Sequence, residues 1–308
     1  MIGGFLSKQQ YIWIDGKFIP LEKANVPILT HSLQYGSGIF EGIRAYASNK
    51  GTAVFRLKDH VERFLRSAKI YSMNLGYSAE ELGDAVTALV RKNGLKSCYI
   101  RPYAFYNDDH IGLDVSGKKI SVAIAAVDFG SYFGGKDKGI NCIVSSWRRI
   151  NSQILPVQAK ASGNYLNSII ASYEAKLRGA DEAILLDIRG YIAEGPGENI
   201  FLVRDNKLIT PSESSDILLG ITRDSIMKLA ESRGIEVEER LVHREELYTA
   251  DELFFCGTAA ELTPITHVDS RAVNGGKVGP ITKMFSKAYS DASTGYDNVF
   301  SSSWLTFV

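Results

Sequence analysis

The sequence predicts an α+β fold built from two domains. In the N-terminal part of the chain, strand patterns come first, two helical patterns follow, and strand patterns then return. A glycine-rich segment separates this part from a second series of strands and helices. A chain of 308 residues is long enough for two hydrophobic cores. We therefore expect a small domain over residues 1–127, a connection over 128–139 and a larger domain over 140–308.

Two hairpins are expected at the start of the first domain. In the first, the strands 11–14 and 17–19 are separated by Asp15-Gly16, a dipeptide typical of a type I′ turn. In the second, residues 42–46 pair with residues 52–55 across a polar loop. The other elements expected in this domain are a helix from Asp59, a helix over 79–92, and strands over 97–106 and 120–127.

Lys160 lies just before an expected helix, among small and polar residues. Pro156 favours an extended chain ahead of the lysine, and Gly179 ends the helix. Because an ammonium group is disfavoured at the positive end of a helix dipole, this setting favours a neutral, nucleophilic amine. N-cap chemistry is expected from Ser162, Gly163 and Asn164, and anchoring of the helix to the core from Leu166, Ile169, Ile170, Tyr173 and Leu177.

Short strands and two more helices are expected in the rest of the second domain. The strands are 140–145, 182–186, 191–193, 199–203, 207–209 and 251–256, and the helices are 222–232 and 281–289. Residues 301–308 are apolar for a chain end, so we expect this tail to dock on a neighbouring surface.

Composition excludes several classes of function. The 35 Lys and Arg residues balance 35 Asp and Glu residues, which is not the basic character of a nucleic-acid binder. The three cysteines are far apart and form no CxxC pair, so we expect buried thiols in a reducing, cytoplasmic compartment. The apolar run at the N-terminus is too short for a signal peptide, and residues 120–127 are too few to span a bilayer.

Two motifs are weighed and rejected. Residues 130–136 match the GxxxxGK skeleton of a nucleotide-binding loop, but Asp137 follows where a Ser or Thr is needed, and its charge would repel phosphates. The five histidines show no pairwise spacing typical of metal ligands, so no metal site is expected.

The segment 191–201 carries two acids around a Gly-Pro-Gly turn. Both could be exposed turn residues, as acids usually are. Alternatively, one of them holds a ring nitrogen, because pyridoxal phosphate acts as an electron sink while its pyridine is kept protonated by a carboxylate. Either Glu194 or Glu198 could serve, and the chemistry alone does not choose between them.

Several segments could bind the phosphate of such a cofactor. Gly220-Ile221-Thr222 begins a helix, where backbone N–H groups and a hydroxyl form an anion site. Thr258 follows an expected strand in a second turn, and Arg56 could add a fixed positive charge. Together with Lys160 and one of the two acids, these residues make up the set that a pyridoxal phosphate site requires.

These segments resemble the fold-type IV pyridoxal phosphate enzymes, whose architecture is like that of D-amino acid aminotransferase, and in particular the branched-chain amino acid aminotransferases. The resemblance extends over nearly the whole chain. The segments that carry it are residues 31–36, 40–44, 55–60, 99–102, 160–165, 194–199, 220–223 and 257–259.

The resemblance implies a role for each candidate residue. Lys160 would hold the cofactor covalently and move the α-proton, and Glu194 would face the pyridine nitrogen. The remaining cofactor contacts would come from Tyr165 at the 3-oxygen and from Arg56, Ile221, Thr222 and Thr258 at the phosphate. Substrate contacts would come from Tyr99 and the Thr258–Ala259 turn at the α-carboxylate, from Phe40, Tyr35 and Tyr132 at the side chain, and from Arg101 at the distal carboxylate of glutamate.

The implied reaction is the transfer of an amino group from leucine, isoleucine or valine to 2-oxoglutarate, by at least a homodimer whose second subunit completes the pocket. One departure is that Phe129 stands where relatives often carry tryptophan, which leaves the pocket size open. Two rivals share the fold and the lysine, namely a D-amino acid or amine aminotransferase and an aminodeoxychorismate lyase. The segment 99–102 favours the branched-chain group over both.

Overall fold

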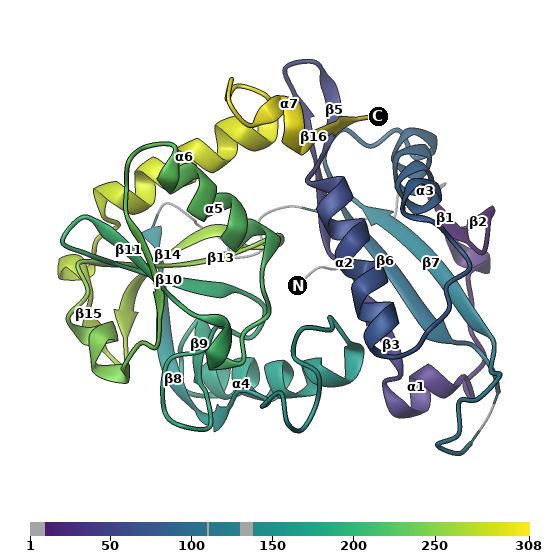
Figure 1. Cartoon of the computed structure of the whole chain (residues 1–308), viewed down its shortest axis with the longest axis horizontal. Coiled ribbons are helices and arrows are strands. Elements are labelled where there is room, and N and C mark those ends of the chain that lie inside the picture. The colour runs from purple at the N-terminus through teal and green to yellow at the C-terminus, as the bar shows by residue number, and fades with distance from the viewer. Residues whose placement is uncertain (1–9, 110, 130–137) are drawn as a thin grey trace. The chain divides into compact units, whose positions relative to one another are not determined.

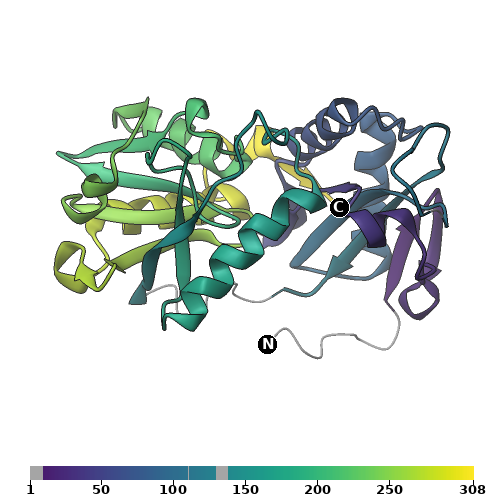
Figure 2. The same ribbon diagram turned by 90° about the horizontal axis from the view of Figure 1, so that it is seen from below.

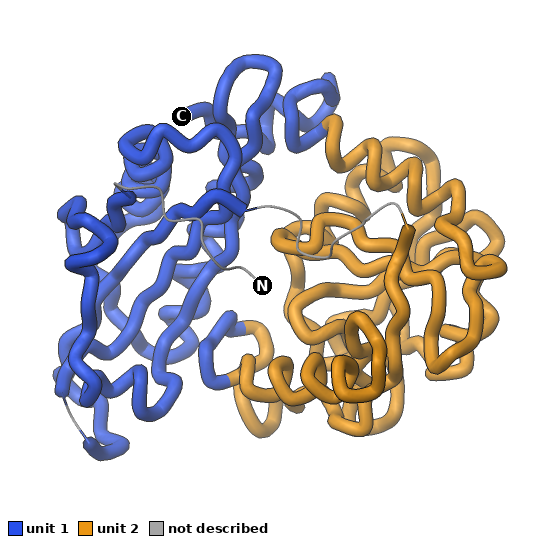
Figure 3. Tube along the Cα trace, turned by 180° about the vertical axis from the view of Figure 1, so that it is seen from behind, with its two compact units in different colours: residues 1–130, 159–163, 292–308 blue, residues 131–158, 164–291 orange. Residues whose placement is uncertain are grey.

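The computed structural model describes residues 10–109, 111–129 and 138–308 (Figures 1 and 2). The chain forms two compact units (Figure 3). Unit 1 comprises residues 1–130, 159–163 and 292–308, and unit 2 comprises residues 131–158 and 164–291. Within the described residues, no helix has both the length and the apolar character needed to cross a bilayer.

Unit 1 contains an antiparallel sheet with two helices on one face (Figure 1). In order across the sheet, its strands are β16 (Leu305–Phe307), β5 (Gly51–Phe55), β4 (Ile43–Ser48), β6 (Cys98–Tyr106), β7 (Ile120–Val127), β1 (Tyr11–Ile14) and β2 (Lys17–Pro20), with β3 (Gly38–Phe40) beside β6. The helices of this unit are α1 (His31–Tyr35), α2 (Leu57–Ile70), α3 (Ala79–Lys92) and α7 (Ser301–Trp304).

Local sequence explains much of this unit. Asp15 and Gly16 both have positive φ, 46° and 85°, which confirms the tight first hairpin. Helix α3 begins with a capping box in which Ser78 and Glu81 satisfy each other's backbone N–H groups. Its apolar face and that of α2 pack into one core with the sheet. Strands β4 and β5 pair antiparallel with Ser48 opposite Gly51, so both hairpins and both long helices of unit 1 are confirmed.

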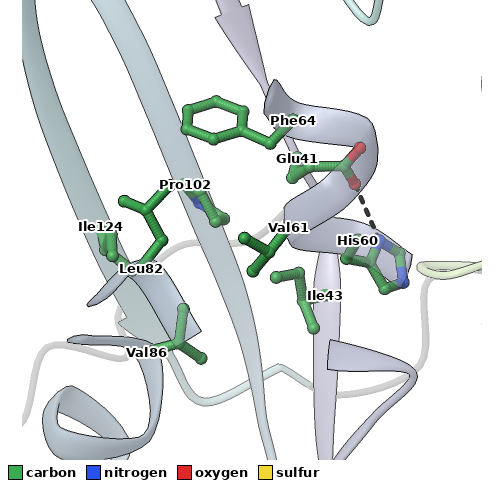
Figure 4. A pocket seen from close by; sticks show the side chains of 9 residues that line it. All are labelled: Glu41, Ile43, His60, Val61, Phe64, Leu82, Val86, Pro102 and Ile124. Atoms are coloured by element: carbon green, nitrogen blue, oxygen red, sulfur yellow. Dashed lines mark hydrogen bonds and ion pairs between the residues drawn. The ribbon is translucent and has the colours of Figure 1, made fainter. Parts of the chain in front are cut away.

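A charged cluster of Glu41, His60 and Arg63 is buried in unit 1, and Figure 4 shows the contact between Glu41 and His60. Arg63 Nε lies 2.7 Å from Glu41 Oε1, and His60 Nδ1 lies 2.8 Å from Glu41 Oε2. Although burial alone would raise the pKa of Glu41, the Arg63 and His60 partners hold it well below its usual range. Burial lowers the pKa of His60. A small apolar cavity with room for about one water molecule adjoins the cluster.

Unit 2 contains a mixed sheet. In order, its strands are β12 (Val237–Arg240), β11 (Lys207–Pro211), β10 (Asn199–Arg204), β13 (Glu252–Gly257), β14 (Glu261–Val268), β8 (Ile140–Arg148) and β9 (Glu182–Leu186), with β15 (Arg271–Ala272) beside β14. Its helices are α4 (Tyr165–Leu177), α5 (Ile221–Glu231) and α6 (Pro280–Thr294), the last residues of which are assigned to unit 1. The predicted α+β class is thus confirmed in both units.

The predicted orientation of α4 is wrong. Helix α4 lies against β8 and β9 (Figure 1). Its buried residues are the small ones, Ser168, Ala171 and Ala175, and the two alanines share a core cluster with residues of both strands. The residues expected to anchor it are on its outer side, and Leu166 and Leu177 are 67% and 70% exposed. The predicted N-cap is also wrong, because residues 162–164 form a 3₁₀ turn and Asn164 makes no side-chain cap. Gly179 ends the helix region with a φ of 74°, as predicted.

Other expected elements differ only in detail. Residues 191–193 form isolated bridges to Leu186 and His243 instead of a strand. The strands β12, β14 and β16 and the short helix α1 were not expected from the sequence. The apolar tail pairs with β5, so its predicted docking surface lies within unit 1. The rejected nucleotide motif lies outside the described residues.

The compact units depart from the predicted continuous domains at two places. Residues 159–163 and the chain end both belong to unit 1. The first segment is attached by backbone bonds, since Phe40 N–H donates to Lys160 O at 2.9 Å and Lys160 N–H donates to Ser67 Oγ at 3.1 Å. Lys160 was expected in the larger second domain, and these bonds place it in unit 1 instead.

The buried cluster predicts a large effect of one substitution. Glu41→Gln should lower the free energy of unfolding by roughly 3–5 kcal/mol, because it removes the charge that compensates the buried Arg63. Urea denaturation measures this effect. Glu62→Gln on the exposed side of α2 is the matched control and should change stability by less than about 0.5 kcal/mol. Equal effects of the two substitutions would contradict this account of the cluster.

Candidate active site

Lys160 lies on unit 1 next to an aromatic ring. Its Nζ atom is 5.2 Å from the centroid of the Phe40 ring. The backbone bonds to Phe40 and Ser67 hold the lysine on both sides of its Cα atom. Because Ser67 belongs to α2, the position of Lys160 depends on how this helix packs against the sheet.

The predicted substrate residues Tyr99, Arg101 and Phe40 form one group in unit 1. The guanidinium carbon of Arg101 lies 4.6 Å from the Phe40 ring centroid, and Arg101 Nη2 donates to the Tyr99 hydroxyl at 3.1 Å. The ring of Phe129 lies 4.9 Å from that of Tyr99. Gly42 leaves room for the Tyr99 ring, because a Cβ atom at this position would overlap the Tyr99 hydroxyl and force the ring to shift. The Arg101 guanidinium and the neighbouring aromatic rings therefore form one surface of unit 1, which is part charged and part apolar.

The other two residues expected at the side-chain pocket are less informative. Tyr35 lies on α1 with its ring 4.7 Å from that of His31, and it is partly exposed. Tyr132 lies outside the described residues. The predicted pocket-lining role of both tyrosines thus stays a prediction.

Arg56 is buried at the junction of β5 and α2. Its guanidinium pairs with Asp59 through two contacts of 2.6 and 2.8 Å. The hydrogen bonds from Arg56 lower the pKa of Asp59. The guanidinium also lies 5.0 Å from the ring centroid of Trp304, so it is held on two sides. Arg56 is thus a buried, paired cation, and its predicted contact with a phosphate stays a prediction.

Glu194 is buried in unit 2 among donors. Arg149 Nε lies 2.7 Å from its Oε1 atom. Asn199 Nδ2 and the Leu218 N–H donate to its Oε2 atom at 3.0 and 3.1 Å. Each of these partners stabilises the ionised carboxylate. The interpretation of this acid as an exposed turn residue is therefore wrong.

Glu198, the alternative acid, has a different environment. It too is buried, and its Oε2 atom accepts the N–H of Gly197 at 3.0 Å. Burial raises the pKa of the Cys256 thiol, and the negative charge of Glu198 adds to this effect. Glu198 thus lies near the Cys256 thiol of β13, whereas Glu194 is paired with Arg149.

The residues predicted to bind phosphate in unit 2 lie at the start of a helix and just after the end of a strand. Ile221 and Thr222 are the first residues of α5, whose first N–H groups have no acceptor within the helix. Thr258 and Ala259 form the turn after β13. Gly220 is required before α5, because a Cβ atom there would overlap the Asn199 side chain. Asn199 in turn binds Glu194, so the acid and the helix start are connected.

Tyr165 is the first residue of α4 and lines an open groove in unit 2. The groove has a volume of about 340 Å³. Its other lining residues are Ser168, Ile169, Ser172, Tyr173, Lys176, Glu182, Pro196 and Gly197. Pro196 and Gly197 belong to the turn that separates Glu194 from Glu198.

Three supporting residues were missed in the sequence. Arg149 pairs with Glu194, Ser67 holds Lys160, and Trp304 covers Arg56. Each lies more than 40 positions from its partner in the chain, so local spacing carries no sign of the contact. A weak sign for Arg149 is its place just after a strand, where functional side chains often lie.

The charges suit pyridoxal phosphate. Taken by itself, unit 1 carries a lysine and a buried arginine. Taken by itself, unit 2 carries a buried carboxylate with its own arginine, and a helix start whose first N–H groups have no acceptor within the helix. A carboxylate kept charged suits a pyridinium, and the arginine and the helix start suit a phosphate. Within the described residues, no group of three or more His, Cys, Asp or Glu is placed to hold a metal ion.

Comparisons with known proteins agree on one family. A protein-family model described as "Amino-transferase class IV" matches residues 38–268 of this chain. The branched-chain-amino-acid aminotransferase of Salmonella typhimurium is 46% identical over 291 residues, which are 94% of this chain and 94% of the relative.

Solved structures agree as well. The crystal structure of the branched-chain aminotransferase of Thermoproteus uzoniensis with norvaline is 48% identical, with a TM-score of 0.93, and the similarity covers 97% of this chain and 99% of the other. The branched-chain amino acid aminotransferase of Thermobaculum terrenum in its PLP-form is 38% identical, with a TM-score of 0.91. This second similarity covers 97% of this chain and 98% of the other.

The pairing of Arg149 with Glu194 predicts a coupled effect. Arg149→Met should lower the free energy of unfolding by roughly 3–5 kcal/mol, because it leaves a buried carboxylate without its charge partner. Adding Glu194→Gln should restore much of this loss, because both charges are then absent. Urea denaturation of the single and double variants measures the coupling.

Arg148→Met is the matched control, because Arg148 is the exposed neighbour of Arg149. It should leave stability within about 0.5 kcal/mol of the unmodified protein. Strictly additive losses in the double variant would show that the two side chains do not stabilise each other.

Proposed function

Because the chain belongs to the class IV aminotransferases, we propose that it transfers the amino group of leucine, isoleucine or valine to 2-oxoglutarate, using pyridoxal 5'-phosphate. The products are the branched 2-oxo acids and glutamate. Among the features of the geometry, the one that carries this proposal is the stacking of Arg101 on Phe40 beside Tyr99. A surface that offers both a ring and a guanidinium suits one apolar substrate and one substrate with a second carboxylate.

Lys160 is the proposed catalytic residue. Pyridoxal phosphate supplies an electron sink for the pair of electrons left when the α-proton departs. Lys160 would hold the cofactor covalently until the substrate amine displaces it. Its neutral amine would then take the proton from the substrate α-carbon and deliver it to the carbon of the cofactor that carries the amino nitrogen, not back to the α-carbon, so that water can release the 2-oxo acid. The backbone bonds to Phe40 and Ser67 keep the base of this side chain in place meanwhile.

Glu194 is the acid proposed to face the pyridine nitrogen. Its ion pair with Arg149 and its bonds to Asn199 and Leu218 support this choice, because they keep the carboxylate charged and its position fixed. A carboxylate in this state favours a protonated ring nitrogen. Tyr165 is proposed at the 3-oxygen, and Arg56, Ile221, Thr222 and Thr258 at the phosphate.

The substrate site is proposed on the basis of two kinds of contact. The α-carboxylate would bind the Tyr99 hydroxyl and the turn of Thr258 and Ala259. The distal carboxylate of glutamate or 2-oxoglutarate would pair with Arg101. The aliphatic side chain of the other substrate would contact Phe40, Tyr35, Phe129 and Tyr132.

The protein is proposed to act as a homodimer or a higher homo-oligomer. The outer side of α4 supports this, because its large apolar residues have no cover within their unit. An exposed apolar patch of this kind typically marks a protein interface. The residues of this patch are Leu166, Ile169, Ile170, Tyr173 and Leu177.

A cytoplasmic location is proposed as well. Cys98, Cys142 and Cys256 are free and buried in the structure. Burial raises the pKa of each thiol, which keeps the thiols protonated and unreactive. Free thiols of this kind suit a reducing compartment.

A panel of substrates tests the proposed reaction. The purified protein should convert L-leucine, L-isoleucine and L-valine to 2-oxo acids in the presence of 2-oxoglutarate. Lys160→Ala should fold but convert none of them, because it lacks the amine that moves the proton. Faster conversion of D-alanine or of a primary amine would favour a D-amino acid or amine aminotransferase instead. Formation of pyruvate from aminodeoxychorismate would favour an aminodeoxychorismate lyase.

The dual role of the substrate surface predicts a selective effect. Arg101→Ala should slow the half-reaction with glutamate on the order of 10- to 100-fold, the loss expected for one charge-assisted hydrogen bond. The half-reaction with valine should change by less than about threefold, because an aliphatic side chain does not pair with a guanidinium. Stopped-flow half-reactions with both amino acids measure the two effects. An equal loss with both would exclude Arg101 as the group that distinguishes them.

A further inference from the structure

The end of the chain reaches the start of α2. Strand β16 pairs antiparallel with β5, with Leu305 opposite Phe55, and the Val308 N–H donates to the Thr52 carbonyl at 2.9 Å. At the end of this pairing, the Arg56 N–H donates to the Trp304 carbonyl at 2.6 Å. The tail is therefore attached at the residue proposed to bind phosphate.

Arg56 has an unusual backbone conformation at this point. Its φ and ψ are 52° and 36°, in the left-handed region, where residues other than glycine are uncommon. Such a conformation persists where the surrounding structure determines it. Here it connects the end of β5 to the first residue of α2, and the bond to Trp304 O fixes the Arg56 N–H. Without the tail, the backbone at Arg56 would lose this partner.

The Arg56 side chain is held on two sides. Asp59 takes one edge of the guanidinium, with contacts of 2.6 and 2.8 Å. The Trp304 ring covers the guanidinium, with 5.0 Å between the guanidinium carbon and the ring centroid. This distance is within the range of a cation–π interaction, which is stronger where water is excluded. Arg56 is 5% exposed and Trp304 is 7% exposed, so water is largely excluded here.

The Trp304 ring is itself fixed by two aromatic neighbours. It stacks on Phe300 with a centroid distance of 4.3 Å and an interplanar angle of 18°. Its edge contacts Phe55 at 5.6 Å and 90°. Both neighbours belong to unit 1, so the ring cannot turn away from Arg56 without breaking a packed cluster.

We propose that Trp304 is a positioning residue for Arg56, and that the C-terminal segment 300–308 is thereby part of the phosphate-binding site. The ring and the Trp304 carbonyl hold Arg56 in the one conformation that presents a fixed positive charge to a phosphate. This inference rests on the proposed role of Arg56 in holding the cofactor phosphate. It assigns a function to a tail that would otherwise only close the edge of the sheet.

The test compares two ligands that differ only in the phosphate. The full-length protein is freed of cofactor and titrated with pyridoxal 5'-phosphate and with pyridoxal, using the absorbance of the bound ligand. Trp304→Leu keeps an apolar side chain and the backbone bonds but removes the ring, and Trp304→Phe keeps a smaller ring. Phe307→Ala is the matched control on β16, because the Phe307 side chain is 45% exposed.

The ratio of the affinity for pyridoxal 5'-phosphate to the affinity for pyridoxal measures the contribution of the phosphate group to binding. Arg56→Ala should lower the preference for the phosphorylated ligand on the order of 100-fold, as expected for the loss of a charged contact. Trp304→Leu should lower it about tenfold and Trp304→Phe about threefold, in keeping with a cation–π contact, with pyridoxal affinity unchanged. Phe307→Ala should leave the ratio unchanged. Combining Arg56→Ala with Trp304→Leu should lower the ratio no further than Arg56→Ala alone.

The outcomes separate this inference from its premise. An unchanged ratio in Arg56→Ala would overturn the phosphate role of Arg56 and, with it, the inference. A lowered ratio in Arg56→Ala beside an unchanged ratio in the Trp304 variants would overturn the inference alone. An equal loss of affinity for both ligands in Trp304→Leu would show that the tail only stabilises the unit. If Trp304→Leu does not fold, an unchanged ratio in Trp304→Phe overturns the inference.

Discussion

The Glu194 carboxylate of unit 2 lies in a buried position among hydrogen-bond donors. Burial of a charge is costly unless partners compensate it, and Glu194 has an arginine, an amide and a backbone N–H. The segment that carries Arg149 is in turn fastened to the loop that ends at Leu218. Asn151 Nδ2 donates to Asp216 at 2.8 Å, and Gln158 Nε2 donates to the Ile217 carbonyl at 2.9 Å. The acid and its partners thus form one connected network.

Unit 1 solves the same problem for its buried arginines. Arg63 and His60 meet Glu41 on one face of α2, and the same helix presents Arg56 at its start and Ser67 near its end. The packing of α2 therefore determines the positions of Arg56, which is proposed to bind the phosphate, and of the Lys160 backbone. In both units, the residues proposed to act on the cofactor are held by buried groups that do not need to touch it.

The sequence predicted what local patterns encode and missed what distant contacts decide. The hairpin turn at Asp15-Gly16 and the two long helices of unit 1 were predicted because turn chemistry and helical periodicity are local. Helical periodicity gave the wrong orientation for α4. An apolar stripe indicates that one face of a helix will be buried, but it does not indicate whether the core of its own unit or another surface buries it. Trp304 covers Arg56 across 248 positions of the chain, a contact that no spacing rule could reveal. Motif order and chemistry indicated the candidate residues, whereas their supporting partners emerged only from the fold.

The most direct test of this account is the protonation state of the cofactor ring. With ¹⁵N-labelled cofactor bound to the full-length protein, the ¹⁵N chemical shift of the ring nitrogen should be that of a protonated pyridinium near neutral pH. Glu194→Gln should move the shift to that of a neutral pyridine, and Glu198→Gln should leave it unchanged. A neutral ring nitrogen in the unmodified protein, or a shift that responds to Glu198 instead, would contradict the central role of the Glu194 carboxylate.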